Sequence, residues 1–136
     1  EGAEVGAQTT IDGDGPVVIN GSKFRDDLRA HAGEEFILVD SILDDAFLST
    51  GDTLSLKGVF ADGTVQVSGN PDDVYIFDSH ISRFIARFGR GNNSLNVTHS
   101  VFDLFDADGG AGKNIFHDAG NNDFGEFRLR RFVKVD

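Results

Sequence analysis

The sequence predicts an all-β fold, a parallel β-solenoid (a single-stranded β-helix) of about six turns. The first observation is a repeated phrase of two apolar residues two positions apart, followed by a small or acidic residue and usually Ser. Its copies begin at Val17, Phe36, Leu54, Val74, Leu95 and Ile115, at intervals of 19, 18, 20, 21 and 20 residues. The second observation is composition, because 17 Gly, 13 Phe and many Asp and Asn favour strands and tight turns over helices. Since one repeat cannot bury its own apolar face, the copies are expected to stack as one domain.

The first segment of each repeat alternates in the manner of a strand with one buried face. Positions one and three of the phrase are therefore expected to point inward. Position one holds Val17, Phe36, Leu54, Val74, Leu95 and Ile115, and position three holds Ile19, Leu38, Leu56, Ile76, Val97 and His117. In the last repeat this alignment places Phe116 on the outer face.

A corner is expected near position five, because inward-type residues change parity there. Position five is Gly21, Asp40, Gly58, Asp78, His99 and Ala119. Position six is Ser22, Ser41, Val59, Ser79, Ser100 and Gly120. An inward column of Ser just after a corner satisfies backbone groups along the solenoid axis. These Ser are therefore expected to be structural rather than nucleophilic.

The second segment of each repeat ends at a glycine, and these glycines recur at intervals of 18, 18, 20 and 20 residues. The segments are 28–33, 47–51, 65–69, 84–89 and 105–109. The terminal glycines are expected to adopt positive φ, so that the chain can start its return.

Both ends of the stack need covering, because an open solenoid end is an unpaired strand edge. Residues 1–16 lack the repeat and carry four acidic side chains with no Lys or Arg, and residues 124–136 show an amphipathic strand pattern. We interpret residues 1–16 as an N-terminal cap, residues 17–123 as the repeats, and residues 124–136 as a C-terminal capping strand of the same domain.

Paired short segments, an inward Ser column and turns rich in Asn and Gly resemble the right-handed parallel β-helix superfamily, the pectate-lyase-like solenoids. The likeness spans roughly residues 17–120 and is nearest to repetitive bacterial surface proteins, whose turns often read GGAGND before an apolar strand. This resemblance implies a right-handed coil and an extracellular or cell-surface location. The turn GGAGKNIF at 109–116 also resembles one copy of a calcium-binding nonapeptide, although Asn114 stands where the carboxylate ligand belongs.

The charge and composition limit the partners of this chain. A formal net charge of −11 repels phosphate backbones and anionic lipid, so neither nucleic-acid binding nor membrane insertion is expected. The absence of Cys removes disulfides and thiolate metal sites. Because the sequence also contains no Met, we interpret it as a mature fragment or a piece of a longer protein.

One catalytic arrangement is available at the corners of two neighbouring turns. Asp78 and His99 occupy these corners, and Arg83 and Arg87 lie in the same two turns. Together they supply an acid, a base and anion-stabilising groups of the kind that cleaves polysaccharide. The repeats carry no long loops that would form a cleft, so the favoured interpretation assigns no catalytic residue.

Acidic residues also recur just after the first segment of successive turns, namely Asp26, Asp27, Asp44, Asp45 and Asp62. Carboxylates one turn apart lie about 5 Å from each other and repel, unless water screens them or a hard cation such as Ca²⁺ bridges them. The favoured interpretation is that they are solvated turn residues with no metal or cofactor, and a calcium site is the alternative.

A lateral binding surface is expected where large apolar residues fall on the outer parity of the first segments. Its members are Ile37, Val39, Tyr75 and Phe77. Such an exposed apolar patch fits a contact with protein or polysaccharide, or a surface covered by the chain itself or by a second copy.

Charge also segregates along the predicted axis. The first sixteen residues are acidic, whereas residues 124–136 carry four of the 12 Lys and Arg. Opposite ends of two copies could therefore attract each other, and a basic strand lying on the acidic flank of its own molecule is the equal alternative.

These observations favour a non-enzymatic structural or adhesive β-solenoid module of a secreted or cell-surface bacterial protein. The alternative is a fragment of a carbohydrate-active enzyme, or a polysaccharide-binding β-helix, with stabilisation by calcium as a further possibility.

Overall fold

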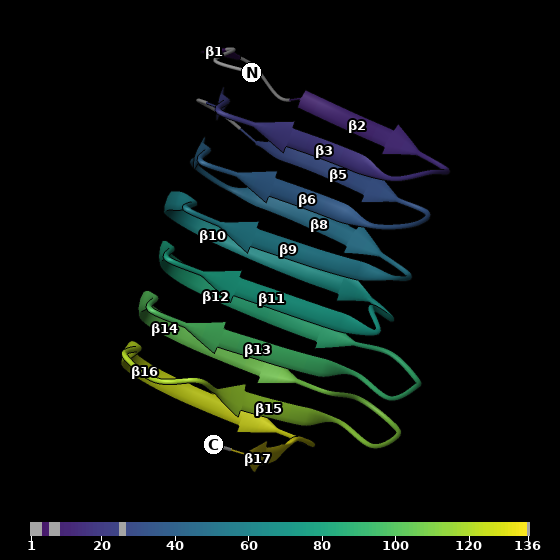
Figure 1. Cartoon of the computed structure of the whole chain (residues 1–136), viewed down its shortest axis with the longest axis vertical. Coiled ribbons are helices and arrows are strands. Elements are labelled where there is room, and N and C mark those ends of the chain that lie inside the picture. The colour runs from purple at the N-terminus through teal and green to yellow at the C-terminus, as the bar shows by residue number, and fades with distance from the viewer. Residues whose placement is uncertain (1–3, 6–8, 25–26, 136) are drawn as a thin grey trace.

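The strands of this protein stack in parallel as a β-solenoid of about seven turns (Figure 1). The computed structural model describes residues 4–5, 9–24 and 27–135. Sheet A contains β1 (Glu4–Val5), β2 (Thr9–Gly13), β4 (Lys23–Phe24), β5 (Leu28–Ala32), β7 (Ile42–Leu43), β8 (Ala46–Thr50), β10 (Phe60–Gly69), β12 (His80–Phe88), β14 (Val101–Asp108) and β16 (Asp123–Arg130). Sheet B contains β3 (Val17–Asn20), β6 (Phe36–Val39), β9 (Thr53–Lys57), β11 (Asp73–Phe77), β13 (Ser94–Thr98), β15 (Ile115–Asp118) and β17 (Val133–Val135).

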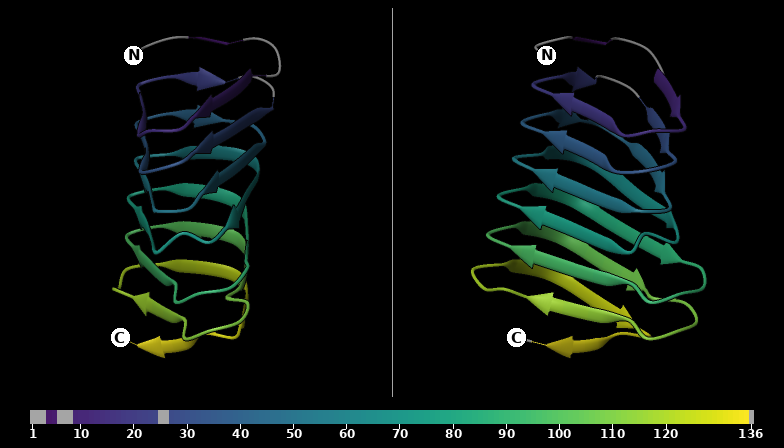
Figure 2. Two further views of the ribbon diagram at one scale, coloured as in Figure 1. Left: turned by 90° about the vertical axis from the view of Figure 1, so that its right-hand side faces the viewer. Right: turned by 45° about the vertical axis from the view of Figure 1, so that its right-hand side comes forward.

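The stack has about seven turns where the sequence predicts about six, because both terminal segments contribute strands. In the N-terminal segment, β2 pairs with β5, from Thr9 opposite Leu28 to Gly13 opposite Ala32. In the last segment, β16 pairs with β14 and β17 pairs with β15. The regions interpreted as caps therefore carry the first and last turns of the column, at its two opposite ends (Figure 2).

The core is one continuous set of inward columns that runs the length of the stack. Phe36, Leu54, Val74 and Leu95 occupy one column, with no exposed surface, as position one of the repeat predicts. Position three is buried in the same way from Ile19 to Val97. The apolar residues that open the second to fifth repeats thus lie above one another inside a single core, and for these repeats the prediction is confirmed.

The sixth repeat is shifted by one residue from the sequence alignment. Leu95 pairs with Phe116, not with Ile115, so that Phe116 is fully buried whereas Ile115 is 42% exposed. The inward positions assigned to Ile115 and His117 are therefore wrong, and His117 lies beside Asn96 on the outer parity.

Two buried asparagines explain the register of this repeat. The Asn93 backbone N–H and side-chain amide both donate to Asn114 Oδ1, at 3.1 and 2.8 Å. Asn93 and Asn114 directly precede β13 and β15, so their pairing aligns the two strands with Leu95 opposite Phe116. The Phe116 ring therefore lies inside, where its centroid is 5.5 Å from that of Phe105.

β8, the second segment of the repeat that begins at Phe36, is also offset by one residue from the sequence alignment. β8 begins at Ala46, which pairs with Val65 and lies inside, while Phe47 faces outward and is half-buried. The offset arises at the bend at Asp44 and Asp45, between β7 and β8. The sequence does not show how many residues a bend takes up, so it does not predict the offset. Since side chains alternate along a strand, an offset of one residue moves Phe47 from the core to the outer face.

The corner and the Ser column agree with the sequence prediction in the first five repeats, whereas in the sixth positive φ falls at Gly120 and Asn121 and not at Ala119. Position five takes positive φ at Gly21, Asp40, Gly58, Asp78 and His99, with values of 48–66°. Just after the corner, the backbone N–H of Ser79 donates to Ser100 Oγ at 3.2 Å, and that of Val59 donates to Ser79 Oγ at 3.1 Å. In the last turn Asn122, not Gly120, accepts the equivalent bond from the Ser100 N–H at 2.9 Å. These Ser act structurally, by satisfying backbone groups of the neighbouring turn.

The glycines that end the second segments are needed mainly for close approach rather than for positive φ. Among those five glycines only Gly69 has positive φ, at 95°. A Cβ on Gly33 would lie 2.4 Å from the Asp14 carbonyl oxygen, and one on Gly109 would lie 2.6 Å from the Arg131 carbonyl oxygen. The expectation of positive φ is therefore wrong for the other four. Gly33 and Gly109 lie too close to the backbone of a neighbouring turn to carry a side chain, whereas a Cβ on Gly51 would meet open space.

Phe105 lies at the centre of the aromatic part of the core, so its truncation should destabilise the solenoid strongly. Its ring centroid lies 5.0–5.5 Å from those of Phe84, Phe102, Phe116, Phe124 and Phe127. Phe105→Ala should lower the free energy of unfolding by about 3–5 kcal/mol, measured by urea denaturation followed by circular dichroism. Phe60→Ala, at a side chain that is 47% exposed, is the matched control and should cost less than about 1 kcal/mol. Equal losses in the two variants would contradict this description of the core.

Candidate binding surfaces

The apolar residues predicted as a lateral surface lie on the outer face of sheet B. Ile37 and Val39 belong to β6, Tyr75 and Phe77 belong to β11, and all four are half-buried. The Tyr75 and Phe77 rings are stacked, with centroids 5.9 Å apart. Because β9 lies between β6 and β11, the four residues form two small apolar areas and not one continuous patch.

Two of the candidate catalytic residues, Asp78 and His99, lie at adjacent corners of the column, and both are exposed. The Asp78 backbone N–H donates to the Thr98 carbonyl oxygen at 3.2 Å, which ties the two corners together. His99 Nε2 lies 3.2 Å from the side-chain amide of Asn121.

The two candidate arginines lie elsewhere on β12. Arg83 Nε donates to Thr64 Oγ1 at 3.0 Å, one turn away. Arg87 follows the start of β12 at His80 by seven residues, which at about 3.3 Å per residue puts it about 23 Å along the strand from the corner. The structure therefore does not bring the four candidate catalytic residues to one place.

The acidic residues after the first segments shape the bend between β7 and β8. Asp45 Oδ1 accepts a hydrogen bond from the Thr64 N–H at 2.8 Å, and the Asp44 carbonyl oxygen accepts one from the Gly63 N–H at 3.1 Å. Asp44 and Asp62 are exposed, Asp27 is half-buried, and Asp26 lies outside the described residues. Within the described part of the chain, no group of three or more His, Asp or Glu side chains is arranged to hold a metal ion.

The outer face of sheet A holds a shallow trough around Phe47. The β-ladder register places Thr10, Arg29, Phe47, Gln66 and Ile85 in one outward column. The Arg29 guanidinium carbon lies 4.6 Å from the centroid of the Phe47 ring, in a cation–π contact.

Two shallow hollows flank the Phe47 ring, one toward each end of the column. The first has a volume of about 190 Å³ and the second of about 340 Å³. Polar side chains of the first are Thr10, Asp12, Arg29 and His31, and those of the second are Gln66, Ser68 and Arg87. We call this surface the Phe47 trough, defined by Arg29, His31, Phe47, Gln66, Ser68, Ile85 and Arg87.

An ion-pair cluster closes the trough toward the C-terminal end. The Asp106 carboxylate, whose side chain is only 9% exposed, lies 3.1 Å from both Arg87 and Arg130. Arg131 donates to both carboxylate oxygens of Asp108, at 2.6 and 2.5 Å. These bonds, together with one from the Gly110 backbone N–H, hold the pKa of Asp108 well below its usual range.

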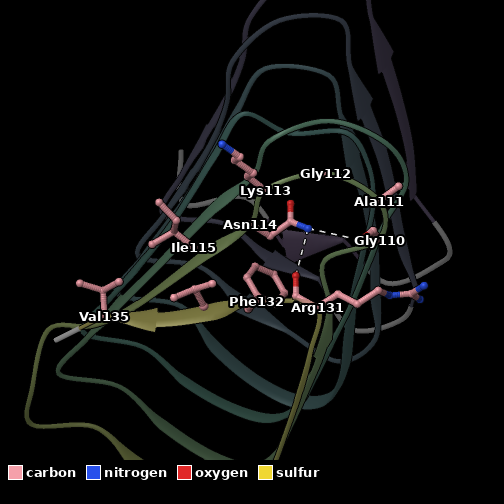
Figure 3. Close-up of a pocket in the computed structure, with 10 residues that line it drawn as sticks. Gly110, Ala111, Gly112, Lys113, Asn114, Ile115, Arg131, Phe132 and Val135 are labelled. Carbon is pink, nitrogen blue, oxygen red and sulfur yellow. Dashed lines mark hydrogen bonds between the residues drawn. The ribbon is translucent and has the colours of Figure 1, made fainter.

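A recess of about 800 Å³ opens at the C-terminal end of the column (Figure 3). It exists because six residues connect β14 to β15, whereas only Arg131 and Phe132 connect β16 to β17. The longer loop therefore overhangs the shorter one. Asn114 holds the two together, since its side-chain amide donates to the carbonyl oxygens of Arg131 at 3.0 Å and Gly110 at 3.3 Å (Figure 3). The lining is largely apolar and includes Ile115, Phe132 and Val133.

Sequence reasoning missed the Phe47 trough for one reason, the offset in β8. The predicted segment 47–51 starts at Phe47, which aligns this residue with the buried Leu28 and Val65 instead of with Arg29 and Gln66. A signal that the sequence does contain is spacing. Leu28-Arg29 and Ala46-Phe47 lie 18 residues apart, which is one of the intervals between repeats. That alignment places Arg29 and Phe47 together on the outer face.

No family model, curated protein or solved structure matches this chain. Among the described residues there is no helix of the length and apolarity that crossing a membrane requires. The geometry of the chain itself therefore carries the functional argument.

The ion pairs at Asp108 should make the stability of the protein depend on pH. Asp108→Asn should lower the melting temperature at pH 7 by a few degrees, because it removes the carboxylate that Arg131 binds. Since the folded pKa is depressed, the ionised form stabilises the fold above the unfolded pKa of about 3.9, and this contribution is lost as the pH falls through the folded value. The difference between the variant and the natural sequence should therefore shrink below about pH 4. Asp103→Asn, at an exposed position of the same strand, is the control, and an equal effect there would contradict this assignment.

The calcium alternative has a direct thermal test. A cation that binds only the folded chain raises the melting temperature. Because Asp45 Oδ1 already accepts the Thr64 N–H, we expect the melting temperature to be the same in chelator and in added Ca²⁺. A rise with Ca²⁺ that Asp62→Asn abolishes would instead establish a calcium site at this bend.

Proposed function

We propose that this chain is a non-enzymatic adhesive β-solenoid module that binds a polysaccharide along the Phe47 trough. The observation that carries the proposal is the half-buried Phe47 ring on the outer face of sheet A, flanked on both sides by hollows whose linings combine apolar and polar side chains. In this proposal the module belongs to a secreted or cell-surface bacterial protein, in keeping with the resemblance of its repeats to pectate-lyase-like surface solenoids.

The chemistry of the trough suits a chain of sugar rings. An aromatic face packs against the apolar C–H face of a sugar, and its neighbours supply hydrogen bonds to the hydroxyl groups. Gln66, Ser68 and His31 offer both donors and acceptors at the hollows. Arg29 fixes one side of the Phe47 ring, so the platform is already ordered before a ligand binds.

The direction of the trough also supports a linear polymer over a single sugar. Its outward columns cross successive strands from β2 to β12, and each strand advances about 4.8 Å along the axis. A ligand that follows the axis therefore meets side chains from one turn after another, all presented by strands that are hydrogen-bonded to their neighbours.

Charge favours a neutral polysaccharide. The formal net charge of −11 repels a polyanion at long range. Arg87, the basic group at one end of the trough, is already paired with Asp106. A hydroxyl-rich polymer without carboxylates is not repelled by this charge and does not need an unpaired arginine.

Removal of the aromatic platform should weaken polysaccharide binding. Phe47→Ala should weaken retention in affinity electrophoresis on neutral polysaccharides by at least about tenfold, as expected when an anchor at the centre of an interface is lost. Phe77→Ala, on the outer face of sheet B, is the matched control and should bind as the natural sequence does. Loss of binding in Phe77→Ala with retention in Phe47→Ala would move the site to the predicted lateral surface on sheet B.

The same incubations test the non-enzymatic part of the proposal. The polysaccharides recovered after incubation should carry no new reducing or unsaturated ends. Chain cleavage that Asp78→Asn or His99→Ala abolishes would instead support the carbohydrate-active alternative at the adjacent corners.

A further inference from the structure

Both ends of the column present strand edges that are unpaired within the described residues. Each sheet stops at its last strand, so β16 and β17 pair only toward the N-terminal side, and β2 and β3 pair only toward the C-terminal side (Figure 1). The core is open at the C-terminal end, where the inward Phe127 is 38% exposed. Unpaired edges of this kind are templates for another strand.

The register of the ladders says what each edge would meet if a second copy continued the stack. The columns that start at residues 9–12 and 17–18 run through all turns, so that these residues of a second copy fall into the columns of the last turn. Leu129 shares a column with Ile11, and Arg130 shares one with Asp12. In this continuation an apolar residue covers an apolar residue, and an acid follows a base.

The charges of the two ends are complementary beyond this one column. Arg128, Arg130 and Arg131 gather at the C-terminal end, where they pair with Glu126, Asp106 and Asp108 of their own chain. Each of the three arginine side chains remains more than half exposed, and the first turn carries Asp12 and Asp14, both exposed. Complementary end charges favour a head-to-tail contact over a head-to-head one.

The C-terminal recess offers room for the same partner. The recess lies at the connection from sheet A to sheet B, beside Arg131, Phe132 and Val133. In the first turn, the equivalent connection between β2 and β3 is Asp14-Gly15-Pro16. Stacked on the last turn, this connection places Pro16 against the apolar lining and Asp14 toward Arg131.

We propose that the edge formed by β16 and β17 binds the edge formed by β2 and β3 of a second copy, extending both sheets in register. The contact is heterologous, so repeated stacking gives an open column and not a closed dimer. This inference is independent of polysaccharide binding, because it uses the ends of the column and not the Phe47 trough.

Lys134 limits the strength of this contact. It lies in the core column of Val17 and Phe116, and its ammonium nitrogen is 5.9 Å from the centroid of the Phe127 ring. An inward-pointing charge at an open edge opposes pairing, because stacking would bury it.

The test is sedimentation velocity of the full chain over a wide range of concentration and salt. The natural sequence should form concentration-dependent head-to-tail species that dissociate as salt rises, because screening weakens the end charges. Asp12→Lys should weaken association about tenfold, because it places like charges opposite each other. Lys134→Val should strengthen association by a similar factor, because it removes a charge that stacking would bury. Asp62→Lys, an exposed substitution in the middle of the column, is the matched control and should leave association unchanged.

Three outcomes would overturn the proposal. The first is a monomer at every concentration for both the natural sequence and Lys134→Val. The second is association that Asp12→Lys and Asp62→Lys weaken equally, which would indicate a general charge effect. The third is a closed dimer with no larger species, since a heterologous contact does not close. Circular dichroism of each variant establishes that the fold is retained, and none of the three changes removes a core side chain.

Discussion

The in-register parallel ladder is the constraint on which the rest of this structure depends. Each turn presents its backbone to the next at the spacing of one strand, so a residue can only be followed along the axis by its equivalent in the next repeat. The interior therefore contains columns of like residues. Stacked Phe rings fill one part, from Phe84 through Phe105 to Phe127, while Ser79 and Ser100 satisfy the backbone at the corner. A side chain that breaks a column acts on two neighbouring turns at once.

The same constraint organises the surface. Outward residues form columns too, so two residues a repeat apart become neighbours, as Arg29 and Phe47 do. Flat faces result, and a binding site on such a face is an elongated trough and not a deep cleft. Acids and bases also meet along the axis, and the Asp106 carboxylate receives Arg87 from the turn before it and Arg130 from the turn after it. A solenoid of this size thus offers extended faces and two ends as its contact surfaces.

The predictable part of the fold is the part that repeats within a continuous strand. The inward column of Phe36, Leu54 and Val74, the corner at Asp40 and Asp78, and the structural Ser all follow from spacing and alternation. The candidate site is harder to predict from the sequence, because its position depends on how many residues each bend takes up. One residue more or less in the bend before β8 decides whether Phe47 lies in the core or on the surface, and the residue types at Asp44 and Asp45 are compatible with both.

The sequence by itself predicted a parallel β-solenoid, since apolar residues that alternate and recur about every twenty residues are buried when the repeats stack. Only the tertiary structure decided the number of turns, the register of the sixth repeat and the residues that face outward on sheet A. These depend on contacts between turns, such as the Asn93–Asn114 hydrogen bonds, which choose between registers that local spacing leaves equal. The terminal strands show the same division: their sequences lack the repeated phrase, and it is the ladder of the preceding turn that aligns them.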